Sequence, residues 1–474
     1  MSYKKIHTQV VVIGSGPSGY SSAFRCSDLG IDTILVERYT NLGGVCLNVG
    51  CIPSKSLLHI AKVIKESRNL SDLGVKFEEP KIDIDKICQW KNKVISNLNS
   101  GIKNLANKRN VKVIFGLAKF LNSNSILIEG EKENIIVSFE NIILAVGSHA
   151  RKLSYVPHND PRIWNSTSAL SIPNIPNNLL IIGSGVIGLE IATIYSSLGS
   201  KVDIIDSSHD LLSHLDRDII NVFFNSISKD FNIILNSDIS KITSHKEGLL
   251  VSINIKKDNI QENKLYDAIL VSVGRIPNLH MLDIEKAGLN IDDNGCLKVD
   301  NKLRTNVPNI YAIGDITGQP MLAHKGIHQG HIVAEIISGK NHFFDPYVIP
   351  CILYTDPEIA WVGMTEKEAI KNNVKYEAAV FPWKALGRAI SSNYSNGMTK
   401  LIFDSQTNKI VGGCIVGNNA GELLGEIGLA IEMGCDAEDI ALTIHAHPTL
   451  YESINLSAQI FQGTVTDLIN SKKN

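Results

Sequence analysis

A short glycine-rich sequence lies between two apolar runs near the start of this chain. Residues 14–19 (GSGPSG) follow the apolar run 9–13, and a helical stretch then leads to a second apolar run, 33–36, which ends at Glu37. This order of strand, Gly-x-Gly-x-x-Gly, helix, strand and acid is the fingerprint of a dinucleotide-binding βαβ unit. The glycines let the backbone approach a pyrophosphate, and the helix N-terminus supplies N–H donors. We therefore expect Glu37 to accept hydrogen bonds from ribose hydroxyls.

The same pattern returns 169 positions later. Residues 183–188 (GSGVIG) lie between the apolar runs 179–182 and 202–205, and the second run is followed by Asp206. The matched sets are Gly14, Gly16, Gly19 and Glu37 in the first copy and Gly183, Gly185, Gly188 and Asp206 in the second. Two copies with matched strands and acids predict two dinucleotide sites. No arginine follows Asp206, which favours NAD over NADP at the second site.

Two cysteines shortly after Glu37 indicate thiol chemistry. Four residues separate Cys46 from Cys51, so one turn of chain can bring the sulfurs together. Pro53 suits the first turn of a helix, whose positive end lowers the pKa of a nearby thiol. Lys55 adds a cation on the same helical face. This setting suits reversible thiol–disulfide exchange, and a structural disulfide or two buried thiols are the alternatives.

Length and composition limit the class of protein. A chain of 474 residues exceeds one ordinary core and predicts about three units. With 20% charged residues and a net charge of −2, it has no excess charge for nucleic acid or an anionic membrane. Eight cysteines do not form a secreted disulfide framework in so long a chain, and residues 1–7 have no apolar signal core. We expect a cytoplasmic protein.

Three further segments complete a family pattern. They are residues 273–278 (VGRIPN), 305–315 (TNVPNIYAIGD) and 445–452 (HAHPTLYE). With the glycine motifs and the cysteine pair, they resemble the pyridine nucleotide-disulfide oxidoreductases, and most closely the lipoamide branch of that family. The resemblance covers residues 10–468. The tail carries no second cysteine pair, unlike that of mercuric reductases.

The resemblance implies an α/β fold with two Rossmann-like domains and a C-terminal α+β dimerisation domain. The expected boundaries are 1–150 for the FAD-binding domain, 151–280 for the NAD-binding domain, 281–349 for a central segment that completes the FAD site, and 350–474 for the dimerisation domain. Val146 departs from the pattern, because threonine is common at that position.

The resemblance also implies the site residues. The expected catalytic residues are Cys46, Cys51, Lys55, Glu190, His447 and Glu452. Beyond the first glycine motif and Glu37, the expected FAD contacts are Lys55, Ala118, Gly314, Asp315 and Ala323. Beyond the second glycine motif and Asp206, the expected NAD contacts are Glu190, Ile239, Gly274 and Arg275. Cys46 would meet the substrate, Cys51 would face the flavin, and His447 would act as acid and base.

The expected function is oxidation of dihydrolipoyl groups in 2-oxo acid dehydrogenase complexes, and in the glycine cleavage system as well. The expected enzyme is a homodimer with one tightly bound FAD per subunit, NAD⁺ as substrate and lipoyl-bearing acyltransferases as partners. Two alternatives remain open. One is another FAD-dependent disulfide reductase of the family, and the other is a mainly docking subunit of the complex.

Three histidines invite a different interpretation. His324, His328 and His331 have the helical spacing i, i+4, i+7, which could align imidazoles as metal ligands. We interpret them as helix-surface and core residues and expect no metal site.

Overall fold

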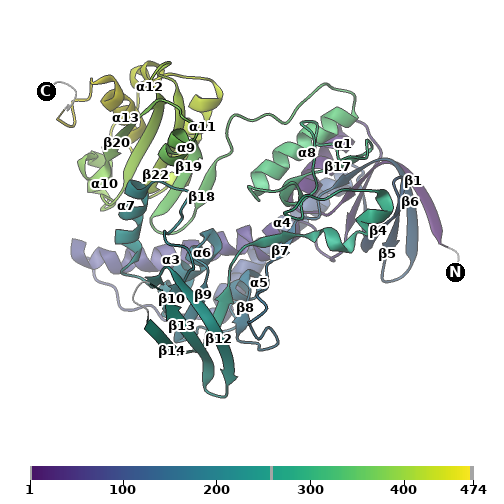
Figure 1. Cartoon of the computed structure of the whole chain (residues 1–474), viewed down its shortest axis with the longest axis horizontal. Helices are drawn as coiled ribbons and strands as arrows, with labels where there is room; N and C mark the ends of the chain where they lie inside the picture. Colours follow the sequence, from purple (N-terminus) through teal and green to yellow (C-terminus); the bar gives the residue numbers. More distant parts are fainter. Residues whose placement is uncertain (1–2, 257–259, 470–474) are drawn as a thin grey trace.

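The computed structural model describes residues 3–256 and 260–469. The tail residues 470–474, the last part of the predicted dimerisation domain, lie outside this range. The fold is α/β, and its two βαβ units and C-terminal α+β unit confirm the predicted fold class. Figure 1 shows the parts around β1, around β9 and around β22 as separate bodies.

The first part is built on one mixed sheet with the strand order β3-β2-β1-β6-β5-β4, and β17 pairs with β6. Its parallel strands β1 and β2 are joined through α1, and Val10 to Ile13 are nearly or fully buried, as expected for a strand covered on both faces. The elements are β1 (Lys4–Ile13), α1 (Pro17–Asp28), β2 (Thr33–Glu37), α2 (Gly44–Val49), α3 (Cys51–Asn69), η1 (Leu70–Leu73), α4 (Ile84–Lys108), β3 (Lys112–Phe115), β4 (Leu117–Asn122), β5 (Ser125–Glu129) and β6 (Asn134–Leu144).

The second part repeats the parallel arrangement in the order β11-β10-β9-β15-β8, with an antiparallel sheet β12-β13-β14 beside it. Leu179, Leu180 and Ile181 are fully buried in the central strand. The elements are β8 (Ile163–Trp164), α5 (Ser166–Ser171), β9 (Asn178–Ile182), α6 (Val186–Ser197), β10 (Lys201–Ile205), α7 (Arg217–Ile227), β11 (Asn232–Ile234), β12 (Ser237–His245), β13 (Gly248–Ile255), β14 (Ile260–Tyr266) and β15 (Ala268–Val271).

A two-stranded antiparallel ribbon connects these two parts. It pairs β7 (Ser148–Ala150) with β16 (Arg275–Pro277), so the chain leaves and returns at the same place. The chain then re-enters the first part, where it forms η2 (Asn278–Met281), η3 (Ile284–Ala287), β17 (Ile310–Ala312), η4 (Gly314–Thr317) and α8 (Ala323–Ile337). The predicted boundary at residue 150 falls at the end of β7, although the domain limits themselves stay predictions.

The C-terminal part is an antiparallel sheet in the order β18-β19-β22-β21-β20. Helices α11 and α13 pack on it around a core that includes Trp383 and Phe403. The elements are β18 (Cys351–Leu353), β19 (Glu358–Gly363), α9 (Glu366–Lys371), β20 (Tyr376–Pro382), η5 (Trp383–Ala385), α10 (Gly387–Ser391), β21 (Met398–Asp404), β22 (Ile410–Gly417), α11 (Ala420–Glu432), α12 (Ala437–Leu442) and α13 (Glu452–Gln462).

Helix α3 holds the three parts together. In Figure 1 it runs between the C-terminal part above and the β9–β14 part below. Its Lys65 Nζ lies 2.8 Å from Asp230 Oδ2 in the second part and 3.4 Å from Asp356 Oδ2 in the C-terminal part. One residue further on, Glu66 accepts a hydrogen bond from the hydroxyl of Tyr394. The helix that begins at Cys51 belongs to the first part and is therefore fixed by side chains of the other two.

A membrane-spanning helix is absent from the described part of the chain, because none of its helices is both long and apolar enough to cross a bilayer.

Candidate functional site

The first glycine turn joins β1 to α1 by close backbone contacts. Gly14 has φ +97, and a Cβ built on it would lie 2.4 Å from the carbonyl oxygen of Ala145. A Cβ on Gly19 would lie 1.7 Å from the carbonyl oxygen of Gly14. At Gly16, the N-cap of α1, an added Cβ meets nothing within 4 Å. Gly14 and Gly19 are thus packed against the backbone, whereas Gly16 leaves free space at the N-terminus of α1, where an anion is favoured.

Glu37 is bonded to this turn. Its Oε2 accepts hydrogen bonds from the Ser15 backbone N at 2.9 Å and from Ser15 Oγ at 2.6 Å. Its Oε1 accepts from the backbone N of Tyr39 at 3.0 Å. The carboxylate is 5% exposed, so these donors compensate its burial. Sequence reasoning named Glu37 but missed Ser15.

The second turn repeats this arrangement. Gly183 has φ +102, and an added Cβ on Gly188 would lie 2.1 Å from the carbonyl oxygen of Gly183. Asp206 Oδ2 accepts from Ser184 N and Oγ, both at 2.7 Å, and Oδ1 accepts from the Ser208 backbone N at 2.8 Å. Burial raises the pKa of Asp206, but the hydrogen bonds from Ser184 and Ser208 outweigh it, so the net pKa lies below its usual value.

The two cysteines lie on either side of a helix break. Cys46 is in the short helix α2, and Cys51 is the first residue of α3, so its thiol lies at the positive end of a long helix. The Cys46 thiol, which hydrogen-bonds to Cys51, lowers the pKa of Cys51 to about 7, and the Lys55 ammonium adds to this effect. The same hydrogen bond, together with burial, raises the pKa of Cys46. In the reduced pair these effects favour a thiolate at Cys51 over one at Cys46.

Two asparagines that sequence reasoning missed support the cysteine loop. Asn48 Nδ2 donates to the carbonyl oxygens of Leu42 at 2.8 Å and Gly44 at 2.9 Å. Asn99 on α4 donates to Asn48 Oδ1 at 2.9 Å and to the carbonyl of Leu42 at 2.8 Å. An asparagine has no sequence signature for this role, so only the structure identifies these contacts.

Lys55 and Glu190 meet across two parts of the molecule. Lys55 Nζ lies 3.0 Å from Glu190 Oε1 and 3.1 Å from Oε2. Glu190 is 5% exposed on α6, two residues after the second glycine motif. The pair links the helix of the cysteines to the helix of the second glycine turn. Tyr354 also contacts this pair, and no sequence signal had indicated it.

Asp315 ends a hydrogen-bond chain that begins at Arg275. Ser148 Oγ donates to Asp315 Oδ2 at 2.5 Å. Arg275 Nε donates to Ser148 Oγ at 2.7 Å, and a second guanidinium N–H donates to the Ser148 carbonyl at 2.6 Å. Through Ser148, the guanidinium of Arg275 is linked to Asp315, a predicted FAD contact. The predicted contact of Arg275 with NAD stays a prediction.

The remaining predicted cofactor contacts are backbone positions and small or apolar side chains. Gly314 precedes Asp315, and its backbone N donates to Gln329 Oε1 at 2.8 Å. Ala323 is the first residue of α8, and Gly274 precedes Arg275 with φ +112. Ala118 on β4 and Ile239 on β12 are buried apolar residues. Their roles as cofactor contacts stay predictions.

The two histidines near the C-terminus differ in their contacts. His447 Nδ1 lies 2.8 Å from Glu452 Oε1, and the His447 side chain is 77% exposed. His445 uses both nitrogens, with Nδ1 2.8 Å from the Thr443 carbonyl and Nε2 2.8 Å from Glu426 Oε1. His447 therefore presents a free Nε2 within the described residues, whereas His445 is held in place. No hydrogen bond joins His447 to either cysteine in the described part of this chain.

The three helical histidines have separate partners. His324 Nε2 lies 2.8 Å from the carbonyl oxygen of Pro350, and His328 packs against Phe344. His331 borders a hollow between α1 and α8.

Asp216, Asp218 and Glu366 form a separate acidic group. Across residues 3–256 and 260–469, theirs is the one group of side chains with metal-ligand spacing. The Lys400 ammonium already binds it, at 3.1 Å from Asp216 Oδ2 and 2.9 Å from Asp218 Oδ2, and it also contacts Glu366.

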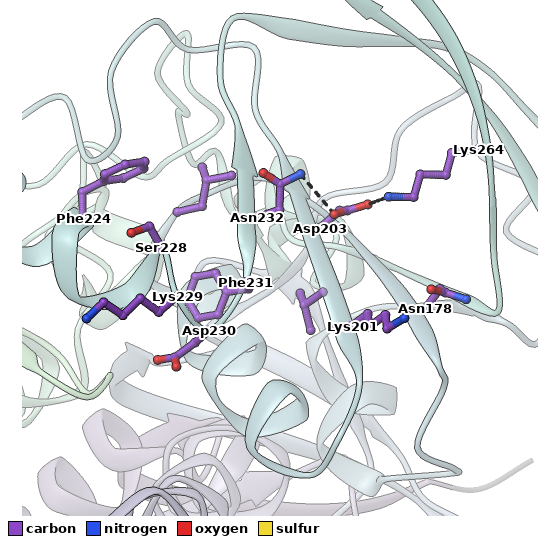
Figure 2. Close-up of a pocket in the computed structure, with 12 residues that line it drawn as sticks. Asn178, Lys201, Asp203, Phe224, Ser228, Lys229, Asp230, Phe231, Asn232 and Lys264 are labelled. Carbon is purple, nitrogen blue, oxygen red and sulfur yellow. Dashed lines mark hydrogen bonds and ion pairs between the residues drawn. The ribbon is translucent and has the colours of Figure 1, made fainter. Parts of the chain in front are cut away.

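A cavity of about 420 Å³ lies on the second part of the molecule, away from its glycine turn. Asn178, Lys201 and Asn232 line it, and each is the first residue of its parallel strand. Figure 2 shows Lys229 extending to the side away from Lys264, whose ammonium binds Asp203. Dinucleotides bind at the carboxyl ends of such strands, so this cavity is separate from the predicted NAD site.

Comparisons with known proteins agree with this geometry. Residues 8–330 match the family described as pyridine nucleotide-disulphide oxidoreductase, and residues 349–458 match the dimerisation domain of that family. A dihydrolipoyl dehydrogenase of Buchnera aphidicola subsp. Baizongia pistaciae is 65% identical over 472 residues, which span 100% of this chain and 99% of that protein. The dihydrolipoyl dehydrogenase of Vibrio parahaemolyticus is 57% identical over 469 residues, which span 99% of this chain and 98% of that protein.

Solved structures show the same architecture. LpdA from Mycobacterium tuberculosis superposes with a TM-score of 0.87 at 25% identity, over 96% of this chain and 99% of that one. The HOCl-induced flavoprotein disulfide reductase RclA from Escherichia coli, in a Cu(II) complex, gives a TM-score of 0.86 at 27% identity, over 97% of this chain and 100% of that one.

Proposed function

The chain belongs to the pyridine nucleotide-disulphide oxidoreductase family, and we propose that it catalyses the NAD-dependent oxidation of dihydrolipoyl groups. Relatives that match its whole length carry the name dihydrolipoyl dehydrogenase. The observation that carries the proposal is the Cys46–Cys51 pair beside the Lys55–Glu190 ion pair, because these groups join thiol chemistry to the second glycine turn.

Each glycine turn has free space beside its second glycine, and this supports a bound nucleotide at each turn. An added Cβ on Gly16 or on Gly185 meets nothing within 4 Å, although the neighbouring glycines are in close backbone contact. We assign FAD to the first turn with Glu37, Lys55, Ala118, Gly314, Asp315 and Ala323. We assign NAD⁺ to the second with Glu190, Asp206, Ile239, Gly274 and Arg275. FAD, when bound, supplies the two-electron carrier between the cysteine pair and NAD⁺.

The thiol step follows from the chain's own residues. A substrate thiolate attacks Cys46 of the enzyme disulfide and displaces Cys51 as a thiolate. The second substrate thiolate then attacks the sulfur of the mixed disulfide that belongs to the substrate, so Cys46 is released and the lipoyl disulfide forms. Two electrons pass from the substrate dithiol to the enzyme disulfide, and the protons go to a base and to Cys46. The Cys51 thiolate is stabilised by the Cys46 thiol and by Lys55.

His447 is the proposed base. Glu452 binds its Nδ1, which leaves Nε2 to take a proton from the substrate thiol. Because His447 makes no hydrogen bond to the cysteines in the described residues of its own chain, we place it at the cysteines of a second subunit. The match to the dimerisation domain supports this homodimer. Lipoyl-bearing acyltransferases and a cytoplasmic location belong to the same proposal.

A pair of assays tests the function. We expect purified protein to reduce NAD⁺ with dihydrolipoamide and to leave NADPH unoxidised in the presence of glutathione disulfide. Activity only in the second assay would assign the chain to another disulfide reductase of the family. A yellow protein that is inactive in both assays would favour the docking role.

Cysteine variants test the site itself. Cys51→Ser should abolish dithiol turnover while flavin stays bound, and the control Cys435→Ser should turn over normally. Normal turnover by Cys51→Ser would disprove the redox pair.

A further inference from the structure

Lys55 has a third contact besides the two oxygens of Glu190. Its Nζ lies 4.3 Å from the ring centroid of Tyr354, over the aromatic face. Tyr354 directly follows β18 and so belongs to the C-terminal part of the chain. An ammonium over an aromatic face is attracted by the ring quadrupole without giving up its N–H donors. Those donors stay available for Glu190 and for charge at the cysteines.

Tyr354 also contacts Glu190. The Tyr354 backbone N donates to Glu190 Oε1 at 3.3 Å, so one residue holds both members of the ion pair, the lysine by its ring and the carboxylate by its backbone. The contact brings together α3, α6 and the segment after β18. A buried carboxylate such as that of Glu190 needs several donors, and this N–H adds to the two bonds from Lys55.

The groups around this cluster make the position of Lys55 important. Lys55 and Glu190 act on the Cys51 thiol in opposite directions, because the ammonium lowers and the carboxylate raises its pKa, after the larger effect of the Cys46 thiol. A small displacement of the ammonium therefore changes the balance at Cys51. Lysine has a long and flexible side chain, so without a fixed neighbour its ammonium would sample several positions.

We propose that Tyr354 is a positioning residue whose aromatic face holds the Lys55 ammonium against Glu190 and so sets the electrostatic environment of the Cys51 thiolate. This rests on the proposed function in taking Cys51 as the thiol that faces the flavin. The ring acts as a neutral phenol: burial, with the carboxylates of Glu358, Glu190 and Glu422 and with Cys51 nearby, raises the pKa of Tyr354. Within the described residues the Tyr354 hydroxyl makes no hydrogen bond, so the aromatic face and the backbone N–H carry the role.

Side-chain replacements separate the ring from the hydroxyl. The test uses holoenzyme of the parent, Tyr354→Phe, Tyr354→Leu and Tyr354→Met. Each is reduced, and its long-wavelength thiolate–flavin charge-transfer absorbance is titrated with pH. All three replacements keep the backbone N–H, and phenylalanine also keeps the aromatic face. Tyr155→Leu, far from the cysteines in sequence and on an exposed loop, is the matched control.

We expect Tyr354→Phe and Tyr155→Leu to titrate as the parent does. Tyr354→Leu and Tyr354→Met should show a thiol that is roughly tenfold weaker as an acid, with flavin content unchanged. If either aliphatic variant that retains flavin titrates as the parent, the positioning role is overturned. It is also overturned if Tyr354→Phe shifts as far as the aliphatic variants.

The outcome is separable from that of the proposed function. A parent protein that shows the charge-transfer titration but no turnover with dihydrolipoamide would refute the substrate and leave the role of Tyr354 intact. A parent that turns over dihydrolipoamide, with aliphatic variants that titrate unchanged, would refute the role of Tyr354 alone.

Discussion

The two glycine turns hold their acids by the same set of hydrogen bonds but differ in what covers them. In each, a serine inside the motif gives its backbone N and its Oγ to one carboxylate oxygen, and the backbone N two residues after the acid bonds to the other oxygen. The first acid, Glu37, is 5% exposed, whereas Asp206 is only half-buried.

The covering of the first turn comes from the segment that leads to the cysteines. Gly43 N donates to the carbonyl of Ser15 at 2.9 Å, and a Cβ added to Gly44 would lie 2.7 Å from Gly16 Cα. The segment after Asp206 makes different contacts. The backbone N of residue 236 donates to the carbonyl of Ser208, and the backbone N of residue 237 donates to the carbonyl of Asp206. The segment that leads to the cysteines therefore covers part of the first turn, and no equivalent segment was found against the second within the described residues. This difference fits the tightly bound FAD and the exchanging NAD⁺ that we propose for the two turns.

The largest expected effect comes from adding one methyl group inside each turn. Gly19→Ala places a Cβ 1.7 Å from Gly14 O, and Gly188→Ala places one 2.1 Å from Gly183 O. We expect Gly19→Ala to lose nearly all bound flavin. Gly188→Ala should keep its flavin, but its KM for NAD⁺ should rise by roughly tenfold or more, because helix α6 must shift by part of an ångström to admit the methyl group. Absorbance spectra and NAD⁺ titrations measure both. Flavin loss in Gly188→Ala would show that the two turns are not independent.

Amide replacements of the acids should have the next largest effect. An amide has one acceptor oxygen where the carboxylate has two, so in Asp206→Asn the NH₂ faces either Ser184 or Ser208. Loss of charge-assisted bonds worth about 1.5–3 kcal/mol predicts a rise of roughly 10- to 100-fold in KM for NAD⁺ with flavin content unchanged.

The matched replacement in the first turn, Glu37→Gln, should instead weaken flavin retention and leave KM for NAD⁺ unchanged, because the two carboxylates bond to different turns. Flavin content after dialysis measures the first effect. A rise in KM for NAD⁺ in Glu37→Gln, or flavin loss in Asp206→Asn, would contradict the assignment of the two turns.

Removing only a hydroxyl should have a smaller effect. Ser15→Ala and Ser184→Ala each lose one hydrogen bond to a carboxylate, while the backbone N–H bond of the same residue remains. At about 1 kcal/mol, this predicts roughly a fivefold loss of affinity at the turn concerned and no change at the other. Isothermal titration with NADH and flavin release during dilution report the two sites separately. Equal losses at both sites in either variant would refute a local effect.

The smallest expected effect is on the stability of the fold at low pH. The folded-state pKa of Asp206 is depressed by its hydrogen bonds from Ser184 and Ser208, which outweigh burial. Its stabilising contribution is therefore complete above the usual pKa of 3.8 and is lost as the pH falls through the lower folded value. In acid unfolding monitored by circular dichroism, Asp206→Asn should lack this part of the pH dependence below about 3.8. An unchanged profile would show that the contribution is negligible.

The sequence predicted the turns because their chemistry is local. The constant spacing between Gly14 and Gly183 identified both units, and the same spacing relates Ser15 to Ser184, so the serines were available to the same argument. The α/β fold followed from the strands beside the motifs. The family resemblance named Lys55 and Glu190 among the site residues, but 135 positions separate them, so no local spacing links the two.

Contacts that depend on three-dimensional packing could not be predicted. Tyr354 meets Lys55 through a ring face, which leaves no motif in the sequence. The contacts of Arg275 also depend on packing, because the ribbon β7–β16 pairs it with Ala150 and brings its guanidinium to Ser148. Its contact with NAD stays a prediction. At Val146, where threonine is common in the family, the backbone carbonyl accepts from Asn278 Nδ2 at 2.9 Å, a contact that does not depend on the side chain at this position.

Helix α3 gives the redox centre a mechanical property. It has 19 residues and therefore spans about 28 Å as one rigid rod, with Cys51 at its first turn and Lys65 near its last. Because Lys65 is bound to Asp230 and Asp356, a shift of either of those parts acts on the same rod that carries the thiol. The helix that carries the Cys51 thiol at one end is thus tied, near its other end, to both of the remaining parts of the molecule.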